Sequence, residues 1–125
     1  MSAPIQRWLA PDNPGTRYHS AVRHGELIFV SGQLGTTSGA ELVDFATQLE
    51  RALENLFAAV RALGGDRKTI LKVNGYLAEL ADFGTYHAIY AKAFEGTDYP
   101  ARTTVQVAGF RPPILVEIDA VAAAL

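Results

Sequence analysis

Two stretches of the chain repeat apolar residues at the spacing of an α-helix. In the first stretch, six apolar positions recur every three or four residues, which places them on one helix face. These positions are Phe45, Leu49, Leu53, Leu56, Val60 and Leu63. Asp44 is placed to cap the start of this helix, and Gly64-Gly65 is expected to end it in a left-handed turn. In the second stretch, Asp82 is expected to cap a helix that ends before Gly96. The apolar positions of that helix are Phe83, Tyr86, Tyr90 and Phe94.

The N-terminal part of the chain predicts a β-hairpin. Residues 1–15 are expected to be loop-rich because turn formers gather at their end, and the first strand is expected to begin near Tyr18. A turn at Gly25-Glu26 then leads to four apolar β-formers at residues 27–30. The small residues at 35–39 are expected to form a loop before the first helix.

Three further strands are predicted in the second half of the chain. Residues 69–77 alternate, with Leu71, Val73 and Leu77 on one side and Lys72, Asn74 and Tyr76 on the other. Strands around 103–107 and 114–121 follow. Residues 109–113 form the loop between them, because its two prolines cannot donate to a central ladder. In the last strand Ile114, Val116, Ile118 and Ala120 suit a helix-covered face, and Leu115, Glu117, Asp119 and Val121 point the other way.

The predicted order of elements is β-β-α-β-α-β-β, which indicates an α+β fold. A chain of 125 residues fits one domain, so residues 1–125 are expected to form a single unit. Two helices can cover one face of a sheet of four to six strands. The other face mixes Leu and Val with carboxylates, so we expect it to meet other subunits of an oligomer.

Composition excludes several classes of function. The net charge is −2, and Lys and Arg form no run, so nucleic acid is not the expected ligand. The absence of Cys excludes a disulfide, a thiolate metal site and a Cys nucleophile, and it is compatible with a reducing cytosol. No apolar stretch has the length of a signal peptide or of a membrane span, so we expect a cytoplasmic protein that does not cross a membrane.

Most catalytic motifs are missing from the chain. It has no phosphate-binding loop and no nucleophile elbow, and its three His residues, at 19, 24 and 87, are scattered, so no metal site is expected. Arg102, which enters a strand just after Pro100, is the strongest candidate. A guanidinium matches a carboxylate with two parallel hydrogen bonds, so Arg102 could hold a small carboxylate ligand. The alternative is a structural ion pair with Glu117 or Asp119.

A set of short segments, by their order and spacing along the chain, carries a family resemblance. They are Tyr18-His-Ser-Ala-Val22 with Gly25, Phe29-Val-Ser-Gly-Gln33, Gln48 with Asn55-Leu56, Lys72-Val73 with Tyr76-Leu77, Asp82-Phe83, Tyr90 with Phe94, Pro100-Ala-Arg-Thr-Thr-Val105, and Val116-Glu-Ile-Asp-Ala120. From Tyr18 to about Ala122 the chain resembles the Rid family, the reactive-intermediate deaminases once grouped as translation-inhibitor endoribonucleases.

The resemblance implies a homotrimer of chorismate-mutase-like α+β domains, each with a mixed β-sheet and two helices on one face. Three ligand clefts are then expected at the subunit interfaces. Enzymes of the family hydrolyse reactive imines, formed from enamines such as 2-aminoacrylate, to 2-keto acids and ammonia. They use no metal and no organic cofactor, so none is expected here.

The resemblance also assigns residues to a site. Arg102 matches the family's carboxylate-binding Arg, and Glu117 matches the acidic residue near the attacking water. Tyr18 matches the Tyr that closes the cleft, and Ser31 and Gly32 match the short turn that lines it. Each assignment has a structural alternative: a salt bridge for Glu117, interface packing for Tyr18, and a plain strand-ending turn for the other two.

The chain departs from the family pattern at three places. His87 stands where relatives often have Asn, and it is either a pocket residue that alters substrate choice or a packed or exposed helix residue. Thr104 stands where many relatives have Cys, and the family's contribution there is a backbone carbonyl. Thr16-Arg17 replaces the more usual Gly-Pro before Tyr18. These departures make a larger, pathway-specific enamine or imine a candidate substrate beside 2-aminoacrylate.

Three functions follow from the sequence. The first is an enamine/imine deaminase that acts on a 2-imino acid. The second is a non-catalytic binder or sensor of small carboxylates that uses the same clefts. The third is an endoribonuclease, which is least favoured because the composition offers no basic surface for RNA.

Overall fold

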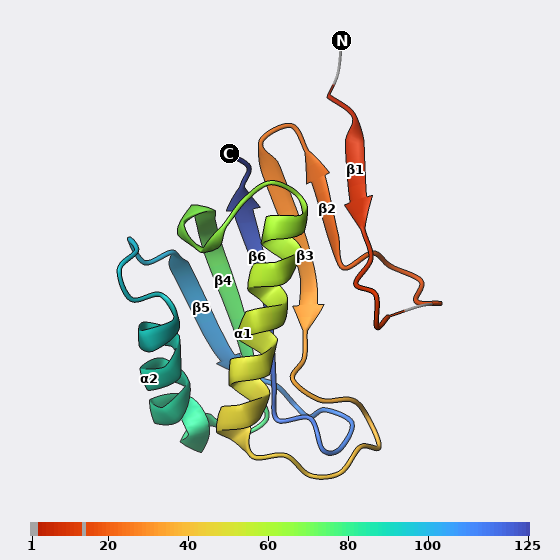
Figure 1. Ribbon diagram of the computed structural model, residues 1–125. Coiled ribbons are helices and arrows are strands. Elements are labelled where there is room, and N and C mark those ends of the chain that lie inside the picture. Colours follow the sequence, from red (N-terminus) through yellow and green to blue (C-terminus); the bar gives the residue numbers. More distant parts are fainter. Residues whose placement is uncertain (1–2, 14) are drawn as a thin grey trace.

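The structure, a computed structural model, describes residues 3–13 and 15–125, and within these residues six strands form one sheet with two α-helices against it (Figure 1). The strands are β1 (Ile5–Trp8), β2 (Ala21–His24), β3 (Leu27–Gln33), β4 (Ile70–Leu77), β5 (Ala101–Gln106) and β6 (Val116–Ala123), and the helices are α1 (Phe45–Ala62) and α2 (Phe83–Ala93). The strand order is β1-β2-β3-β6-β4-β5, with β4 and β5 parallel and the other neighbours antiparallel. The predicted α+β class with a mixed sheet is confirmed.

Helix α1 forms where the apolar stripe predicted it. The Asp44 carboxylate accepts a hydrogen bond of 2.8 Å from the Thr47 amide, which caps the first turn. At the other end Gly64 has a φ of +97°, which ends the helix because side-chain-bearing residues rarely adopt that conformation. All six stripe residues are buried against the sheet. The cap, the stripe and the end of this helix are therefore confirmed.

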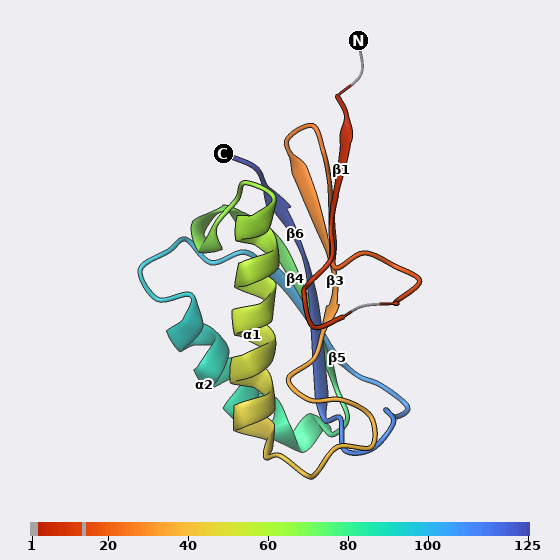
Figure 2. The same ribbon diagram turned by 45° about the vertical axis from the view of Figure 1, so that its right-hand side comes forward.

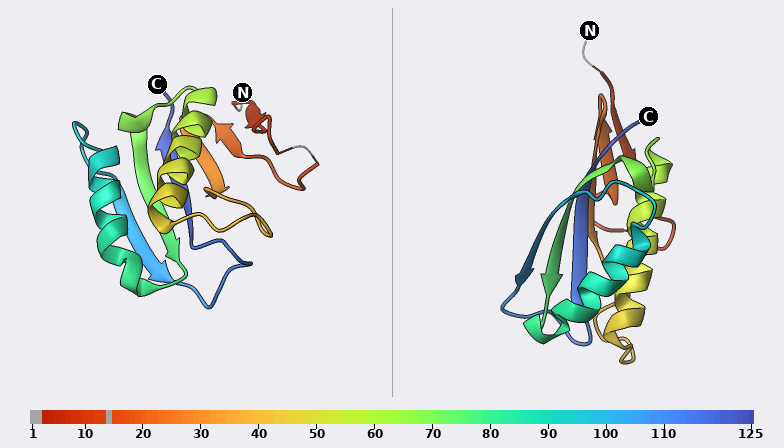
Figure 3. Two further views of the ribbon diagram at one scale, coloured as in Figure 1. Left: turned by 60° about the horizontal axis from the view of Figure 1, so that its bottom comes forward. Right: turned by 90° about the vertical axis from the view of Figure 1, so that its left-hand side faces the viewer.

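Both helices lie against the same face of the sheet (Figures 2 and 3). Along β6, alternate residues from Val116 to Ala122 are buried under the helices, whereas Glu117 and Asp119 face the other way and are partly exposed. This alternation confirms the prediction from Val116 to Val121. The strand begins at Val116, however, so Ile114 and Leu115 lie in the preceding loop, where the Leu115 amide bonds to the Gln48 side chain. The helix-free face also carries Phe29 on β3, whose side chain is 48% exposed. The subunit contact expected on this face stays a prediction, and an exposed apolar side chain of this size agrees with it.

The N-terminal prediction needs correction. Residues 1–15 are not simply loop, because β1 pairs antiparallel with β2 and places Trp8 opposite Ala21. The hairpin of β2 and β3 forms as expected, but its first strand begins at Ala21 rather than near Tyr18. Strand β1 is short, lies at the sheet edge and is mostly exposed, so it has no burial pattern to predict it. Pro14, within the predicted turn, lies outside the described residues.

Two local predictions in the second half of the chain are wrong. Leu71 is 48% exposed, and Ile70 is buried in its place, because the pairing of β4 with β6 shifts between Ile70 and Lys72. A β-bulge of this kind moves the following side chains to the opposite face. Asp82 makes no side-chain cap, because it ends a 3₁₀ turn, Leu80–Asp82, that leads directly into α2.

Gln48 connects three parts of the chain from the buried side of α1. Its Nε2 donates to the carbonyl oxygens of Val43 and Pro113, each at 2.9 Å, and its Oε1 accepts from the Leu115 amide at 2.9 Å. The side chain is fully buried. Gln48 thus holds the loop before α1 against the loop before β6, close to the start of the strand that carries Glu117.

Replacing Gln48 by Met should destabilise the fold by about 2–4 kcal/mol, because it leaves buried backbone groups without hydrogen-bond partners. The free energy of unfolding in urea measures this loss. The same substitution at the exposed Gln6 serves as the control and should change stability by less than about 0.5 kcal/mol. Equal stability of the two variants would contradict the structural role of Gln48.

Candidate functional site

Arg102 lies on β5, the edge strand beside α2 (Figure 1). Its register opposite Val73, a buried core residue, directs the side chain toward the helix-covered face. The guanidinium carbon Cζ lies 4.7 Å from the ring centroid of Tyr90 and 5.7 Å from those of Phe83 and Tyr86. Stacking of a guanidinium on aromatic faces is attractive and restricts its orientation. The aromatic residues of α2 therefore position this cation.

His87 is the hydrogen-bond partner of Arg102. Arg102 Nη1 lies 3.1 Å from His87 Nδ1. A guanidinium can only donate, so Nδ1 accepts, and this contact requires a neutral imidazole with its proton on Nε2. The His87 ring also stacks on Phe83, with 6.0 Å between centroids. Glu117 and Asp119 project from the opposite face of the sheet, so the alternative ion pair within one chain is wrong.

Buried hydroxyl groups lie beneath the Arg102 side chain. In the described part of the chain, Tyr86 Oη, Tyr90 Oη and Thr104 Oγ1 are buried without a hydrogen-bond partner. Burial raises the pKa of Tyr90 to about 12, against the smaller opposite effect of the Arg102 charge, and it raises the pKa of Tyr86 as well. Both phenols therefore stay neutral. The Thr104 hydroxyl lies within this cluster, under α2, rather than on an open surface.

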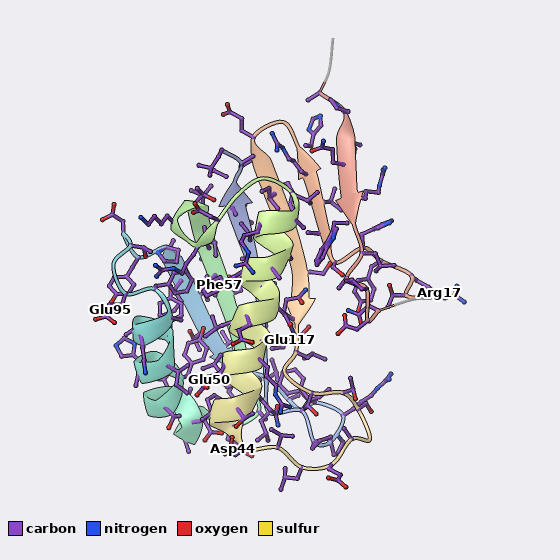
Figure 4. The ribbon with its side chains drawn as sticks, viewed as in Figure 1. Arg17, Asp44, Glu50, Phe57, Glu95 and Glu117 are labelled. Atoms are coloured by element: carbon purple, nitrogen blue, oxygen red, sulfur yellow. The ribbon has the colours of Figure 1, made fainter. Side chains whose placement is uncertain are left out.

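Glu117 lies on the helix-free face beside the end of β3 (Figure 4). It shares a hollow with Gly32, Tyr76 and Asp119, and with three residues that follow β5: Val107, Gly109 and Phe110. A side chain at Gly32 would overlap the Glu117 carboxylate, so this close approach requires glycine. Burial raises the pKa of Glu117, and the negative charge of Asp119 raises it further.

Asp119 has its two carboxylate oxygens occupied. Oδ1 accepts from Asn74 Nδ2 and Oδ2 accepts from Tyr76 Oη, each at 2.8 Å. The second bond, with burial, raises the pKa of Tyr76 to about 12. Asp119 is thus a fixed negative charge beside Glu117. Sequence reasoning did not assign Asn74, Tyr76 or Asp119 to the site, although their alternation with the buried residues placed them on one face.

Tyr18 and Ser31 lie on the β3 side of the sheet. Tyr18 is 60% exposed and lines, with Trp8 and Gly32, a hollow between the N-terminal loop and α1. Gly32 lines both this hollow and the one at Glu117, so the two hollows lie next to each other. The Ser31 hydroxyl donates to the His19 carbonyl at 2.7 Å. That bond ties β3 to the segment just before β2. Ser31 and Gly32 lie within β3, where its pairing with β6 shifts between Val30 and Gln33, so they do not form the predicted turn.

The predicted site residues form two groups within one chain. Arg102 and Glu117 lie on strands separated by β4, and Arg102 aligns through Val73 with Ala120, three residues from Glu117. The spacing between strands places the two backbones about 10 Å apart across the sheet, and the rise per residue places them about 10 Å apart along it. Their side chains project from opposite faces of the sheet. One small ligand cannot contact both groups of the same chain. The structure brings His87 and Thr104 to Arg102, and it brings Gly32 to Glu117 with Tyr18 nearby.

Residues 3–13 and 15–125 offer neither a cluster of metal ligands nor a helix that could span a membrane. No group of three or more His, Asp or Glu side chains is arranged to hold a metal ion. Neither α-helix combines the length and hydropathy needed to cross a membrane. The cytoplasmic location stays a prediction from the sequence.

The family model described as endoribonuclease L-PSP matches residues 9–124. A RutC family protein of Sinorhizobium fredii is 37% identical over 127 residues, covering 97% of each chain. The chain belongs to the endoribonuclease L-PSP, or Rid, family. A 2-iminobutanoate/2-iminopropanoate deaminase of Rattus norvegicus is 38% identical over 108 residues, covering 84% of this chain and 78% of the rat protein.

Solved structures of the Rid family share the fold. A protein of unknown function of the conserved Rid family from Yersinia pestis superimposes with a TM-score of 0.86 at 26% identity, covering 97% of this chain and all of that chain. The predicted family and its chorismate-mutase-like α+β fold are therefore confirmed. Some Rid relatives are named as imine deaminases, which supports this activity at the level of the family.

Proposed function

We propose that this Rid-family chain is a cofactor-independent enamine/imine deaminase that hydrolyses a 2-imino acid to a 2-keto acid and ammonia. The substrate is of the 2-aminoacrylate type or is a larger, pathway-specific enamine. The observation that carries the proposal is the setting of Arg102. Its guanidinium is held on Tyr90, one N–H is bonded to His87, and it lines a hollow beside α2.

Arg102 has the donors that a carboxylate requires. A guanidinium has five N–H groups, and the bond to His87 uses one of them. The remaining donors can bind the two oxygens of a substrate carboxylate in parallel. Because the aromatic rings restrict the rotation of the guanidinium, little further ordering is needed when the ligand binds.

Glu117 is suited to act on water. The raised pKa of Glu117 makes its carboxylate a stronger base than an ordinary one. In the proposed reaction, Glu117 takes a proton as the water oxygen bonds to the iminium carbon of the substrate. Glu117 then returns that proton to the nitrogen and takes the proton of the new hydroxyl as the C–N bond breaks, so the keto acid forms and the nitrogen leaves as ammonium once it has accepted this second proton. The electrophile is already present in the iminium, so the site chiefly positions the reactants.

A complete site needs a second subunit under this proposal. Arg102, with His87, would come from one subunit of a homotrimer, and Glu117, with Tyr18 and Gly32, would come from its neighbour. The separation of the two groups on opposite faces of one sheet supports this arrangement. The exposed apolar side chains on the helix-free face, Leu27 and Phe29, support contact between subunits there.

A carboxylate-binding protein without catalysis is the second candidate. It is supported by the same Arg102 setting, because a carboxylate could bind there without any contribution from Glu117. An endoribonuclease, the activity in the family's description, has less support, since the net charge of −2 offers little attraction for RNA.

The deciding assay generates 2-aminoacrylate in situ from serine with a lyase and follows the release of pyruvate. The protein is expected to accelerate release well above the spontaneous rate. If no imino acid is hydrolysed faster while a small carboxylate still raises the Tm, the binder is the correct function. Cleavage of RNA that survives repurification, and is lost in the Arg102→Ala variant, would instead identify the endoribonuclease.

A further inference from the structure

A hollow of about 420 Å³ adjoins Arg102 on the outer side of α2 and β5. His87, Tyr90 and Ala91 of α2 line it from one side, and Tyr99, Pro100 and Arg102 line it from the other. Its volume lies in the range of small-molecule sites. It is much larger than the methyl group of 2-iminopropanoate requires. The hydrolysis proposed above uses only the Arg102 end of this space, for the substrate carboxylate, and gives the rest of it no role.

The surfaces of the hollow are flat and aromatic. The Tyr99 ring is 60% exposed and lies nearly parallel to the buried Tyr90 ring, with 6.4 Å between centroids and 19° between planes. The exposed His87 ring lies nearly parallel to Phe83, at 13°. Ala91 leaves space between these rings because its side chain is a single methyl group. Exposed rings that are already held by neighbouring rings offer stacking surfaces at little cost in side-chain entropy.

The hollow carries a positive charge at one end. Among its six lining residues, Arg102 is the one with a permanent charge, and none is acidic. A fitting ligand therefore has a carboxylate at the Arg102 end and an uncharged remainder. An aromatic ring suits that remainder, since it can stack on Tyr99 and His87 and remove apolar area from water.

We propose that the hollow binds the side chain of the substrate, and that the preferred substrates are 2-imino acids with an aromatic side chain. Tyr99 and His87 are then specificity-determining residues. The inference rests on the proposed deaminase function, because it takes Arg102 as the group that holds the carboxylate. It goes beyond that function by naming the substrate class and the residues that select it.

A kinetic comparison tests the specificity. An amino-acid oxidase produces the imines of phenylalanine and alanine in situ, and kcat/KM is measured for each. Wild-type protein should favour the phenylalanine imine, and Tyr99→Ala should lower the ratio of the two kcat/KM values about 5- to 10-fold. The Leu42→Ala variant, at an exposed loop position, serves as the control and should keep the wild-type ratio. An unchanged ratio in Tyr99→Ala would overturn the inference.

A binding comparison separates this inference from the proposed function. The Kd of 3-phenylpropanoate and of propanoate is measured by calorimetry for wild type and for Tyr99→Ala. Tighter binding of 3-phenylpropanoate that is weakened by Tyr99→Ala supports the binding of an aromatic side chain in the hollow. If this binding is seen but no imine is hydrolysed, the deaminase function is wrong and the assignment of the hollow stands. Hydrolysis of small imines with equal affinity for the two carboxylates would overturn the hollow and leave the deaminase standing. Because Tyr99 is exposed, the variant should fold, and Tyr99→Leu provides a second variant.

Discussion

Replacing Arg102 by Ala is expected to lower kcat/KM for 2-imino acids about 100- to 1,000-fold. The substitution removes two charge-assisted hydrogen bonds to the substrate carboxylate, a loss in the range of about 3–4 kcal/mol at 1.4 kcal/mol per tenfold. Arg102→Lys should recover little of this activity, because an ammonium lacks the planar fork and its stacking on Tyr90. Steady-state kinetics over a range of substrate concentrations measures both variants.

Arg61→Ala is a suitable control for the Arg102 variants, because Arg61 is exposed on the last turn of α1. It removes the same charge from the chain and should leave kcat/KM unchanged. Circular dichroism and Tm should show that the variants are folded. Activity of Arg102→Ala within about twofold of wild type would mean that another group binds the carboxylate.

Replacing Glu117 by Gln is expected to lower kcat about 100- to 10,000-fold, because it removes the general base that accepts the proton of water. The KM should change much less, since the carboxylate of the substrate still binds Arg102. Glu50→Gln, at an exposed position of α1, is the matched control (Figure 4). Full activity of Glu117→Gln would assign water activation to a different residue.

The pH dependence of kcat/KM in the wild-type protein also tests Glu117 as the general base. Glu117 acts as a base when ionised, so activity falls as the pH drops through its pKa. Burial first, and the charge of Asp119 second, raise that pKa above its ordinary value. The acidic limb of kcat/KM should therefore lie above the usual carboxylate range. Asp119→Asn should move the limb to lower pH, and the remaining upward shift comes from burial.

Mixing the two inactive variants tests whether subunits share a site. After random exchange between Arg102→Ala and Glu117→Gln subunits of a trimer, about a quarter of the interfaces would combine an intact Arg102 with an intact Glu117. Activity should then return to about a quarter of the wild-type value. If the mixture stays inactive after exchange is demonstrated by mass spectrometry, both groups act from the same chain.

The spacing of apolar residues predicted correctly those helices and strands that are buried on one side along their whole length. The stripe of α1 and the alternation of β6 report burial on one side, so the residues themselves indicate which face meets the core. The alternation wrongly placed Leu71 on the buried face, because the β-bulge arises from the pairing of β4 with β6 and cannot be seen in the sequence of β4 alone. Strand β1 was missed for a related reason: its hydrogen bonds to β2, rather than any burial, make it a strand.

The sequence by itself determined the family, the two-helix α+β fold and Arg102 as the leading candidate for carboxylate binding. Periodicity also placed Glu117 and Asp119 on one side of their strand. The tertiary structure decided that Arg102 faces α2 and His87, and that Glu117 faces the opposite side. These facts depend on the order β3-β6-β4-β5 and on the register between strands. Such contacts join residues distant in the chain, and local periodicity contains no information about them.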